Sequence, residues 1–465
     1  MKLVRLTLIA NGFSETSSGG GAGAGAGADF SLLWTGSIIR SQVYQQLSRF
    51  QKVNHFPRSY EITRKDCLCQ RITRMQTVYG SRHFSFLPKT FILPSDLKEL
   101  GEEMARHKQQ LWIVKPAASS QGKGIFLTNN IQSIPSKQAM IASHYLASPL
   151  LIDGVKFDLR IYVAVTSVNP LRVYMYKEGL ARFATQKYEA GAEGSGGGRG
   201  SRYMHLTNYS INKNAHNFVK NTDADQDDIG QKWSLRALRK RLREAGIDDE
   251  AIWAKIEDIV IKTIISAEPM LNNGMELYVP FRTNCFELLG FDILIDADLT
   301  PWLLEVNMSP SLNIDSPLDA KIKGEMLANL FTLVGVVPHE LRGEKPHSQQ
   351  GSAGAGPRSR AGKLAVYTAG SSRLVGSGHF DAVSWGLIKK NFQRGGGERQ
   401  RMRSSEEGEG GRRWPGGGAA GVGTAHPSRE ERQAVRESEE ELKRQGGFCR
   451  IFPSPYYGYY KQFFG

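Results

Sequence analysis

Residues 301–312, "PWLLEVNMSPSL", combine the apolar pattern of a buried strand with two polar side chains at the end of that strand. Glu305 and Asn307 are two residues apart, and side chains two apart in a strand point to the same face of the sheet. An acid at the end of a buried strand needs a partner, because burial of an unpaired charge is costly. The stretch therefore raises the question of what this partner is.

The preceding apolar segment, "CFELLGFDILID" at 285–296, supplies a second acid for the same face. If the intervening loop closes a hairpin with Asp296 opposite Pro301, antiparallel pairing places Asp292 opposite Glu305. Polar residues at the edge of a half-exposed sheet are the alternative, but the apolar flanks indicate burial and favour a metal site. Carboxylate and amide oxygens are the ligands that Mg²⁺ prefers. The predicted metal ligands are Asp292, Glu305 and Asn307.

A second polar stretch, "KPAASSQGKG" at 115–124, follows a short apolar strand. Lys115 at the end of a buried strand can reach a phosphate, and the serines and glycines after it leave backbone N–H groups available to phosphate oxygens. The pattern is neither a Walker motif nor a dinucleotide fingerprint, because the lysine precedes the glycines. A plain Gly-Lys-Gly hairpin turn is the alternative interpretation.

The composition is that of a folded protein with a basic surface. The chain has 465 residues, 40 % of them hydrophobic, and a formal net charge of +14. A basic balance favours acidic partners such as nucleic acid, anionic membrane or an acidic polypeptide, without choosing among them. No nucleic-acid recognition motif is found. The four cysteines lack zinc-site spacing, and we expect neither a signal peptide nor a membrane span.

Changes in composition along the chain predict its organisation. Strands are expected at 110–116, 125–129, 157–167, 171–184, 285–296 and 301–307, helices at 234–245, 249–269 and 317–336, and a glycine-rich loop at 191–201. We expect a Gly/Ala-rich insert within 1–29, a small domain at 30–98, sheet-containing subdomains at 99–181 and 182–340, a mostly disordered linker at 341–435, and a charged helix with an aromatic tail at 436–465.

Together these segments resemble the tubulin-tyrosine-ligase-like family of the ATP-grasp superfamily, and within it the glutamylating branch. The resemblance covers most of residues 30–337 and is carried by "LLWTGS", "QKVNHFPRSYEITRKD", "WIVKPAASSQGKG", "PLLIDGVKFDLRIYV", "EGLARFAT", "MHLTNYSINK", "CFELLGFDILID" and "PWLLEVNMSPSL". It implies an ATP-grasp fold of the α+β or α/β class, with a nucleotide held between the two subdomains. "GGFCRIFP" near the C-terminus is similar to the start of a cationic microtubule-binding region.

The resemblance implies an ATP- and Mg²⁺-dependent ligase that joins free L-glutamate to glutamate side chains of tubulin tails through an acylphosphate and an isopeptide bond. The implied partners are tubulin and microtubules, with a monomer that binds no nucleic acid and does not insert into membranes. The implied location is the cytoplasm and cytoskeleton, including the cilium or basal body. A ligase for glycine or tyrosine, and a microtubule-binding protein with a degenerate ATP site, are the alternatives.

The resemblance also assigns roles to residues, which we list by the group each set would contact. The phosphates would meet Lys115, Gln121 and Gly122. The adenine would lie against the hinge residues Ser143, His144, Tyr145 and Leu146. The rest of the nucleotide wall would be Lys156, Phe157, Asp158, Thr207 and Asn208. Incoming glutamate would bind Arg182, assisted by Tyr209, Ser210, Lys232 and Lys323, with Gln121 also facing the acceptor. The residues expected to carry catalysis are Lys115, Arg182 and Glu305.

Overall fold

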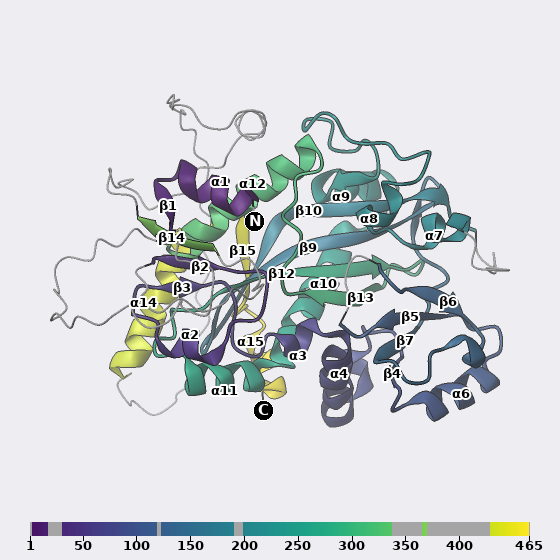
Figure 1. Ribbon diagram of the computed structural model, residues 1–465, viewed down its shortest axis with the longest axis horizontal. Helices are drawn as coiled ribbons and strands as arrows, with labels where there is room; N and C mark the ends of the chain where they lie inside the picture. The colour runs from purple at the N-terminus through teal and green to yellow at the C-terminus, as the bar shows by residue number, and fades with distance from the viewer. Residues whose placement is uncertain are drawn as a thin grey trace, which may run out of the picture.

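The computed structural model describes residues 2–16, 30–118, 122–189, 199–336, 365–369 and 428–464. Three sheets and the helices packed on them make up this part of the chain. In Figure 1 a large central sheet lies between an N-terminal sheet on the left and a small sheet on the right. The mixture of helices and sheets agrees with the predicted fold class.

The central sheet has seven antiparallel strands, with β11-β10-β9-β12-β13 in spatial order, β8 beside β9, and β15 beside β10. The long hairpin of β9 and β10 forms its middle, and the predicted strands 157–167, 171–184, 285–296 and 301–307 are all found here. The strands are β8 Leu151–Ile152, β9 Val155–Val168, β10 Leu171–Lys187, β11 Lys232–Ser234, β12 Glu287–Ile295, β13 Pro301–Asn307 and β15 Phe448–Phe452.

Helices cover both faces of this sheet, which explains why β9 and β12 are buried along nearly their whole length. One face packs in a cluster that includes α10 Asp249–Ile265 and α11 Glu268–Tyr278. The other face packs against α12 Pro317–Val334 and α1 Lys2–Ala10. Charged residues in so buried a strand need partners inside the protein, so Lys156, Asp158 and Arg160 of β9 mark where the sheet departs from a simple core.

Helix α12 begins at the predicted residue 317 and ends at Val334, two residues before the predicted end, and its caps explain both ends. The Ser316 hydroxyl accepts a hydrogen bond from the backbone N–H of Asp319 at 3.2 Å, which caps the first turn. Gly335 ends the helix with a φ of 64°, a left-handed conformation that glycine adopts without a steric penalty. Predicted helix 234–245 is α9 Leu235–Glu244, whereas predicted helix 249–269 breaks at Ser266 and Ala267 into α10 and α11.

The small sheet has the order β4-β7-β5-β6 and packs on α6 Leu97–Arg106. Its strands are β4 Thr90–Leu93, β5 Trp112–Pro116, β6 Phe126–Thr128 and β7 Met140–His144. Because β4 pairs with β7, the domain boundary expected at residue 98 moves to before β4. The boundary expected at residue 181 falls inside β10 and therefore does not separate two structural units.

The N-terminal sheet has the order β1-β14-β2-β3, with β1 Phe13–Thr16, β2 Leu32–Trp34, β3 Lys52–Val53 and β14 Ala365–Ala369. Strand β14 lies within the segment 341–435 that we expected to be mostly disordered, and this expectation is wrong for 365–369. The rest of that segment up to residue 427, and the insert at 17–29, lie outside the described residues. Helix α2 Ser41–Gln45 lies between β2 and β3 in the chain, and β3 is followed by α3 Tyr60–Thr63, α4 Lys65–Tyr79 and α5 Ser81–Phe84.

The loop expected at 191–201 ends earlier than predicted. Residues 190–198 lie outside the described part, and a helix, α7 Arg199–His205, begins directly after them. A short helix α8 Tyr209–Asn212 follows. "MHLTNYS" at 204–210 therefore spans the end of α7, the non-helical residues Leu206, Thr207 and Asn208, and the start of α8.

The C-terminal segment returns to the central sheet through α14 Arg429–Lys443, strand β15 and α15 Tyr457–Tyr460. Glu441 of α14 is buried and accepts hydrogen bonds from Arg172 at 2.9 and 3.0 Å and from Thr166 at 2.8 Å. The charged helix expected here is present, but with four basic and six acidic residues α14 does not itself provide a cationic surface.

Two further expectations concern the whole described chain. Among the described residues no helix is long and apolar enough to cross a bilayer. All four cysteines are free thiols, as expected from their spacing: Cys67, Cys69, Cys285 and Cys449.

Candidate active site

An open cleft of about 1150 Å³, its mouth included, lies between the small sheet and the central sheet. Twelve predicted site residues line it, drawn from β5, β7, β9, β12, β13, the loop after β5 and the segment after α7. They are Lys115, Gly122, Ser143, His144, Tyr145, Leu146, Lys156, Asp158, Thr207, Asn208, Asp292 and Glu305. Residues far apart in the sequence thus meet around one cleft that is large enough for a ligand.

The predicted pairing of Asp292 with Glu305 is confirmed, although the turn that produces it differs from the expected one. Ile295, not Asp296, lies opposite Pro301, and one extra residue on β13 restores the predicted register at Asp292. This irregularity is a β-bulge, which sequence alone does not reveal. Asp296 instead closes the turn, since its carboxylate accepts from the backbone N–H of Thr300 at 2.9 Å.

The four side chains Asp292, Arg160, Arg182 and Asp158 form a buried charge network across β12, β9 and β10. Arg160 Nε and Nη2 donate to Asp292 at 2.6 and 3.1 Å. Arg182 donates to both oxygens of Asp158 at 2.7 and 2.6 Å and to Asp292 at 2.8 Å. Burial alone would raise the pKa of Asp292, but the charges of Arg160 and Arg182 outweigh it and hold this pKa well below its usual range.

The role expected for Arg182, binding of incoming glutamate, stays a prediction, and the structure shows where the residue lies. The residue does not line the cleft, and its guanidinium is already engaged by two carboxylates. The proximity of Asp158 and Asp292 raises the pKa of Arg182 despite burial, so it remains charged. In this arrangement Arg182 orients two acids of the cleft wall, and a substrate carboxylate would have to compete with them.

Glu305 is in a different environment, because its side chain keeps 24 % exposure and faces the cleft. Lys65 Nζ lies 3.0 Å from one Glu305 oxygen, and the Asn307 amide donates to the other at 3.3 Å and to the Gly290 carbonyl at 3.2 Å. Asn307 thus lies beside Glu305, as the strand alternation predicted.

The donor set fits a hard divalent cation in ligand type, since it offers two carboxylates and an amide oxygen at one end of the cleft. Within the described ranges there is no group of three or more His, Cys, Asp and Glu side chains placed to hold a metal ion. Both Asp292 oxygens already accept from guanidinium groups. Glu305 and Asn307 would therefore hold Mg²⁺ most directly, with Asp292 behind them.

Lys115 and Gly122, which we expected to meet phosphates, both line the cleft. Lys115 is buried at the end of β5, and burial lowers its pKa while the nearby Glu305 carboxylate opposes this shift. Gly122 has a φ of 73°, and a Cβ there would lie 2.6 Å from Ile211 Cδ1 and 3.4 Å from Asn208 Oδ1. Glycine is therefore needed for the loop to approach α8. Gln121 lies outside the described residues.

A hydrogen-bonded chain of three buried residues forms the opposite wall. Lys156 Nζ donates to the Tyr145 hydroxyl at 3.0 Å, and that hydroxyl lies 2.8 Å from His205 Nδ1. Burial lowers the pKa of Lys156 to about 7, against the opposing charge of Asp158. Burial and the charge of Lys156 lower the pKa of His205 to about 4, so His205 is neutral and its Nδ1 accepts a hydrogen bond from the Tyr145 hydroxyl.

The hinge residues flank this chain on β7. Ser143 Oγ accepts from Thr90 Oγ1 at 2.9 Å, and the His144 ring stands edge-on to Trp112. Phe157 corrects the predicted wall, because its side chain points to the opposite face of β9 and packs in the core 5.4 Å from the Phe183 ring. The alternation of strand side chains puts Lys156 and Asp158 in the cleft and excludes Phe157 from it.

The residues expected to assist glutamate binding form a separate cluster beside the cleft. Lys232 Nζ lies 2.6 Å from Asp319 Oδ2 and 4.0 Å from the Tyr209 ring centre, and Lys323 Nζ lies 2.7 Å from Asp319 Oδ1. Burial would raise the pKa of Asp319, but Lys323 and Lys232 lower it to about 2. Lys232 and Lys323 are thus brought together, while Ser210 and Tyr209 follow on α8; none of the four lines the cleft.

Three residues of the site were missed by reasoning from the sequence. Arg160 completes the charge network, Lys65 pairs with Glu305, and His205 ends the chain through Tyr145. The alternation with Lys156 and Asp158 could have placed Arg160 on the cleft face. No local pattern marks Lys65 or His205, because their partners are more than 50 residues away in the chain.

Comparison with known proteins gives a consistent result over the same segments. The model of the "Tubulin-tyrosine ligase family" matches residues 43–344. The chain is 42 % identical over 459 residues to "Tubulin polyglutamylase TTLL5" of Homo sapiens, which covers 97 % of this chain and 32 % of that protein. It is 46 % identical over 302 residues to "Tubulin monoglutamylase TTLL4" of Mus musculus, with 65 % and 25 % covered. The chain thus spans about a third of the length of the first relative and about a quarter of the second.

Proposed function

The chain belongs to the tubulin-tyrosine ligase family, and on that premise we propose that it is an ATP- and Mg²⁺-dependent ligase that attaches L-glutamate to glutamate side chains of tubulin tails. The names of the relatives, a polyglutamylase and a monoglutamylase of tubulin, support glutamate and tubulin as substrates. The observation that carries the proposal is the meeting of Lys115 with Asp292 and Glu305 in one cleft between two sheets.

The proposed reaction has two steps. The γ-phosphoryl group of ATP passes to an acceptor carboxylate, so that the bond to ADP breaks and an acylphosphate forms. The amine of L-glutamate then attacks the acyl carbon, phosphate leaves, and an isopeptide bond remains. Both steps concentrate negative charge, which cations placed in advance stabilise.

The residues of the cleft supply that stabilisation. Lys115 would donate to the phosphates, and the backbone around Gly122 would approach them closely. Lys156, held by Tyr145, would face the nucleotide along the wall formed by β9. Mg²⁺, when bound at Glu305, Asn307 and Asp292, would neutralise phosphate oxygens. The buried network of Arg160, Arg182 and Asp158 keeps Asp292 in its ionised form.

The positive charge of the chain supports an anionic amino acid as one substrate and an acidic polypeptide as the acceptor. The chain carries a formal net charge of +14, which favours association with acidic tails. Lys232 and Lys323 both pair with Asp319, and Lys232 also lies 3.4 Å from Asp315, so the cluster places two ammonium groups side by side where an anionic amino acid would find cations. We also propose that the protein works as a monomer on microtubules, in the cytoplasm and at the cilium or basal body.

The test is incubation of the chain with tubulin, ATP, Mg²⁺ and labelled L-glutamate, followed by mass spectrometry of the tubulin tails. Label on tail glutamates, competed by unlabelled glutamate but not by glycine or tyrosine, is the expected result. Incorporation of labelled glycine or tyrosine instead would indicate a glycine ligase or a tyrosine ligase. Binding to microtubules with no label from any of the three would contradict a ligase.

A further inference from the structure

The aromatic tail expected from the sequence folds back onto the protein after β15. Residues Tyr457–Tyr460 form α15, and a 3₁₀ turn at Lys461–Phe463 follows. Phe463 is buried, and its ring centre lies 5.4 Å from that of Tyr79 and 5.2 Å from that of Phe84. The proposed ligase reaction does not involve this tail, so its contacts call for a separate explanation.

Tyr459 of the tail keeps 39 % exposure, and its hydroxyl group lies 3.0 Å from His83 Nδ1. The other ring nitrogen, His83 Nε2, accepts a hydrogen bond from Arg82 Nε at 2.9 Å. A nitrogen that accepts carries no proton, so the neutral ring has its proton on Nδ1 and donates to the Tyr459 oxygen. This contact therefore leaves the phenolic proton of Tyr459 unused.

Lys262 of α10 brings a further cation to the same tyrosine. Its Nζ lies 5.3 Å from the centre of the Tyr459 ring and 2.7 Å from Asp258 Oδ2. The other oxygen of Asp258 accepts from the Tyr460 hydroxyl at 2.9 Å. Asp258 therefore balances the charge of Lys262 and holds the neighbouring tyrosine of the tail.

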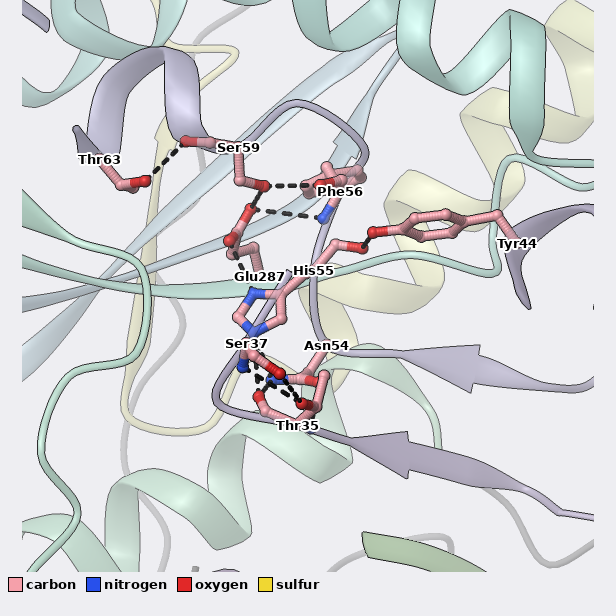
Figure 2. Close-up of polar contacts among 9 residues, drawn as sticks. All are labelled: Thr35, Ser37, Tyr44, Asn54, His55, Phe56, Ser59, Thr63 and Glu287. Carbon is pink, nitrogen blue, oxygen red and sulfur yellow. Dashed lines mark hydrogen bonds and ion pairs between the residues drawn. The ribbon is translucent and has the colours of Figure 1, made fainter. Parts of the chain in front are cut away.

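The surroundings of His83 differ from those of the buried His55, which Figure 2 shows. His55 Nδ1 lies 2.8 Å from Glu287 Oε1 and its Nε2 lies 2.9 Å from the Thr35 carbonyl, so a carboxylate can balance a charged ring. His83 instead lies between a guanidinium and a hydroxyl group. In the part of the chain that the structure describes, neither His83 nor Arg82 forms an ion pair, so the charge of Arg82 is not balanced there.

The electrostatics of this place favour an anion. Burial, and then the charges of Arg82 and Lys262, lower the pKa of His83, while the charge of Asp258 opposes them. The positive charges that disfavour a proton on His83 would stabilise a negative group at the Tyr459 oxygen. A phosphate on tyrosine supplies such a group, with a charge of about −1.5 to −2 at pH 7 and three acceptor oxygens.

We propose that Tyr459 is a phosphorylation site, and that His83 and Arg82 hold the phosphate and thereby fix the aromatic tail to α5. A protein tyrosine kinase transfers the γ-phosphoryl group of ATP. The bond from phosphorus to the ADP oxygen breaks, a bond to the tyrosine oxygen forms, and the phenolic proton is released. The phosphate then accepts charge-assisted hydrogen bonds from the imidazole and the guanidinium. The competing explanation is a tyrosine that only packs, in which case repulsion from Asp258 would release the modified tail.

Genetically encoded phosphotyrosine separates the two explanations without a kinase. We compare Tyr459→phosphotyrosine with the matched control Tyr457→phosphotyrosine. Tyr457 belongs to the same helix, is 46 % exposed and packs 5.8 Å from the Phe452 ring centre. Phosphorus NMR measures the second pKa of each phosphate, which is about 6 without neighbouring cations. Limited proteolysis measures how firmly residues 456–464 are held.

The expected result is a second phosphate pKa about one unit lower at position 459 than at position 457, because nearby cations favour the dianion. Cleavage within 456–464 should be about tenfold slower in Tyr459→phosphotyrosine than in the unmodified chain. Combining this change with Arg82→Gln and His83→Gln should remove both effects, since these two side chains carry them.

The kinase step has its own measurement. The wild-type chain is incubated with ATP and a purified tyrosine kinase domain of broad specificity, and tandem mass spectrometry locates the phosphate. Tyr459 should be modified in a larger share of molecules than Tyr460, which is only 6 % exposed.

Three outcomes would overturn the inference. Equal phosphate pKa values at positions 459 and 457 would remove the cation site. Faster cleavage of the tail in Tyr459→phosphotyrosine would show release instead of attachment. A kinase that modifies Tyr457 and leaves Tyr459 unmodified would remove the phosphorylation site. None of these measurements depends on amino-acid transfer, so they succeed or fail independently of the proposed function.

Discussion

Asp292 and Glu305 lie directly opposite each other on β12 and β13, yet their carboxylates meet different cations. Asp292 accepts from Arg160 at 2.6 Å and from Arg182 at 2.8 Å, deep in the sheet. Glu305 meets Lys65 at 3.0 Å and remains partly exposed to the cleft. One acid is therefore enclosed by fixed partners, while the other is available to a ligand, so the two should respond differently to substitution.

Glu305→Gln should abolish transfer with little effect on the fold. Replacing the carboxylate by an amide removes the charge that would hold Mg²⁺, and a loss of at least about 100-fold in the transfer rate is expected. Because the Lys65 pair is partly exposed, the free energy of unfolding should change by less than about 1 kcal/mol. Transfer of labelled glutamate and urea unfolding measure the two quantities. Full activity in this variant would remove Glu305 from the cation site.

Asp292→Asn should destabilise the protein as well as inactivate it. The substitution leaves the buried Arg160 guanidinium without its carboxylate partner and removes one of the two carboxylates that pair with Arg182, which costs about 3–5 kcal/mol. Asp298→Asn, in the exposed turn between the same strands, is the matched control and should leave stability unchanged. Urea unfolding at pH 7 compares them, and equal midpoints would contradict the importance of the buried network.

The Asp292 pKa also sets a direction for acid stability. Its folded-state pKa lies below the unfolded-state value of about 3.9, so its contribution is present above about pH 4 and is lost as the pH falls further. The difference in unfolding free energy between wild type and Asp292→Asn should therefore shrink below pH 4. A difference that stays constant down to the acid transition would contradict this linkage.

Lys156 should make stability increase with pH. Its folded-state pKa is about 7, below the ordinary value of 10.5, so above pH 7 the unfolded chain binds the proton that the folded protein has lost. Lys156 should contribute a rise in the unfolding free energy between pH 7 and pH 10 with a slope approaching about 1.4 kcal/mol per pH unit, and the difference between wild type and Lys156→Met should show this rise.

The same group should take up a proton when an anionic nucleotide binds near it, because the phosphate charge favours the ammonium form. Calorimetry at pH 8 in buffers of different ionisation enthalpy measures this uptake directly. Lys156→Met should show only the proton uptake that other groups contribute. Lys187→Met, at the end of the neighbouring strand β10, is the control and should take up protons as wild type does. Equal proton uptake by wild type and Lys156→Met would refute the assignment.

Glu441→Gln should loosen the C-terminal segment from the sheet. The variant leaves the buried Arg172 guanidinium, which now donates twice to Glu441, without a charged partner at a cost of about 3 kcal/mol. Limited proteolysis should then cleave α14 and β15 faster than in wild type. Glu440→Gln, an exposed neighbour, should be cleaved at the wild-type rate. If both variants are equally resistant, α14 is held by other contacts.

The sequence by itself determined the family, the strands of the central sheet and most of the cleft. Strand alternation was enough to put Glu305 beside Asn307 and Lys156 beside Asp158, because neighbours two apart on a strand share a face whatever the rest of the chain does. The same rule should have removed Phe157 from the predicted wall. Local reasoning also reached the Asp292–Glu305 pair, although the extra residue on β13 compensated for a wrongly chosen turn.

Only the tertiary structure decided which charges meet. Arg182 of β10 meets Asp158 of the adjacent strand β9 and Asp292 of β12, which lies beyond β9, so the sequence could not show that Arg182 is enclosed by acids. Lys65 reaches Glu305 across 240 residues, and β14 joins β1 across more than 340. The physical reason is that strand period and turn residues act between neighbours in the chain. Charge pairing depends on distance in space, and packing of distant elements sets that distance.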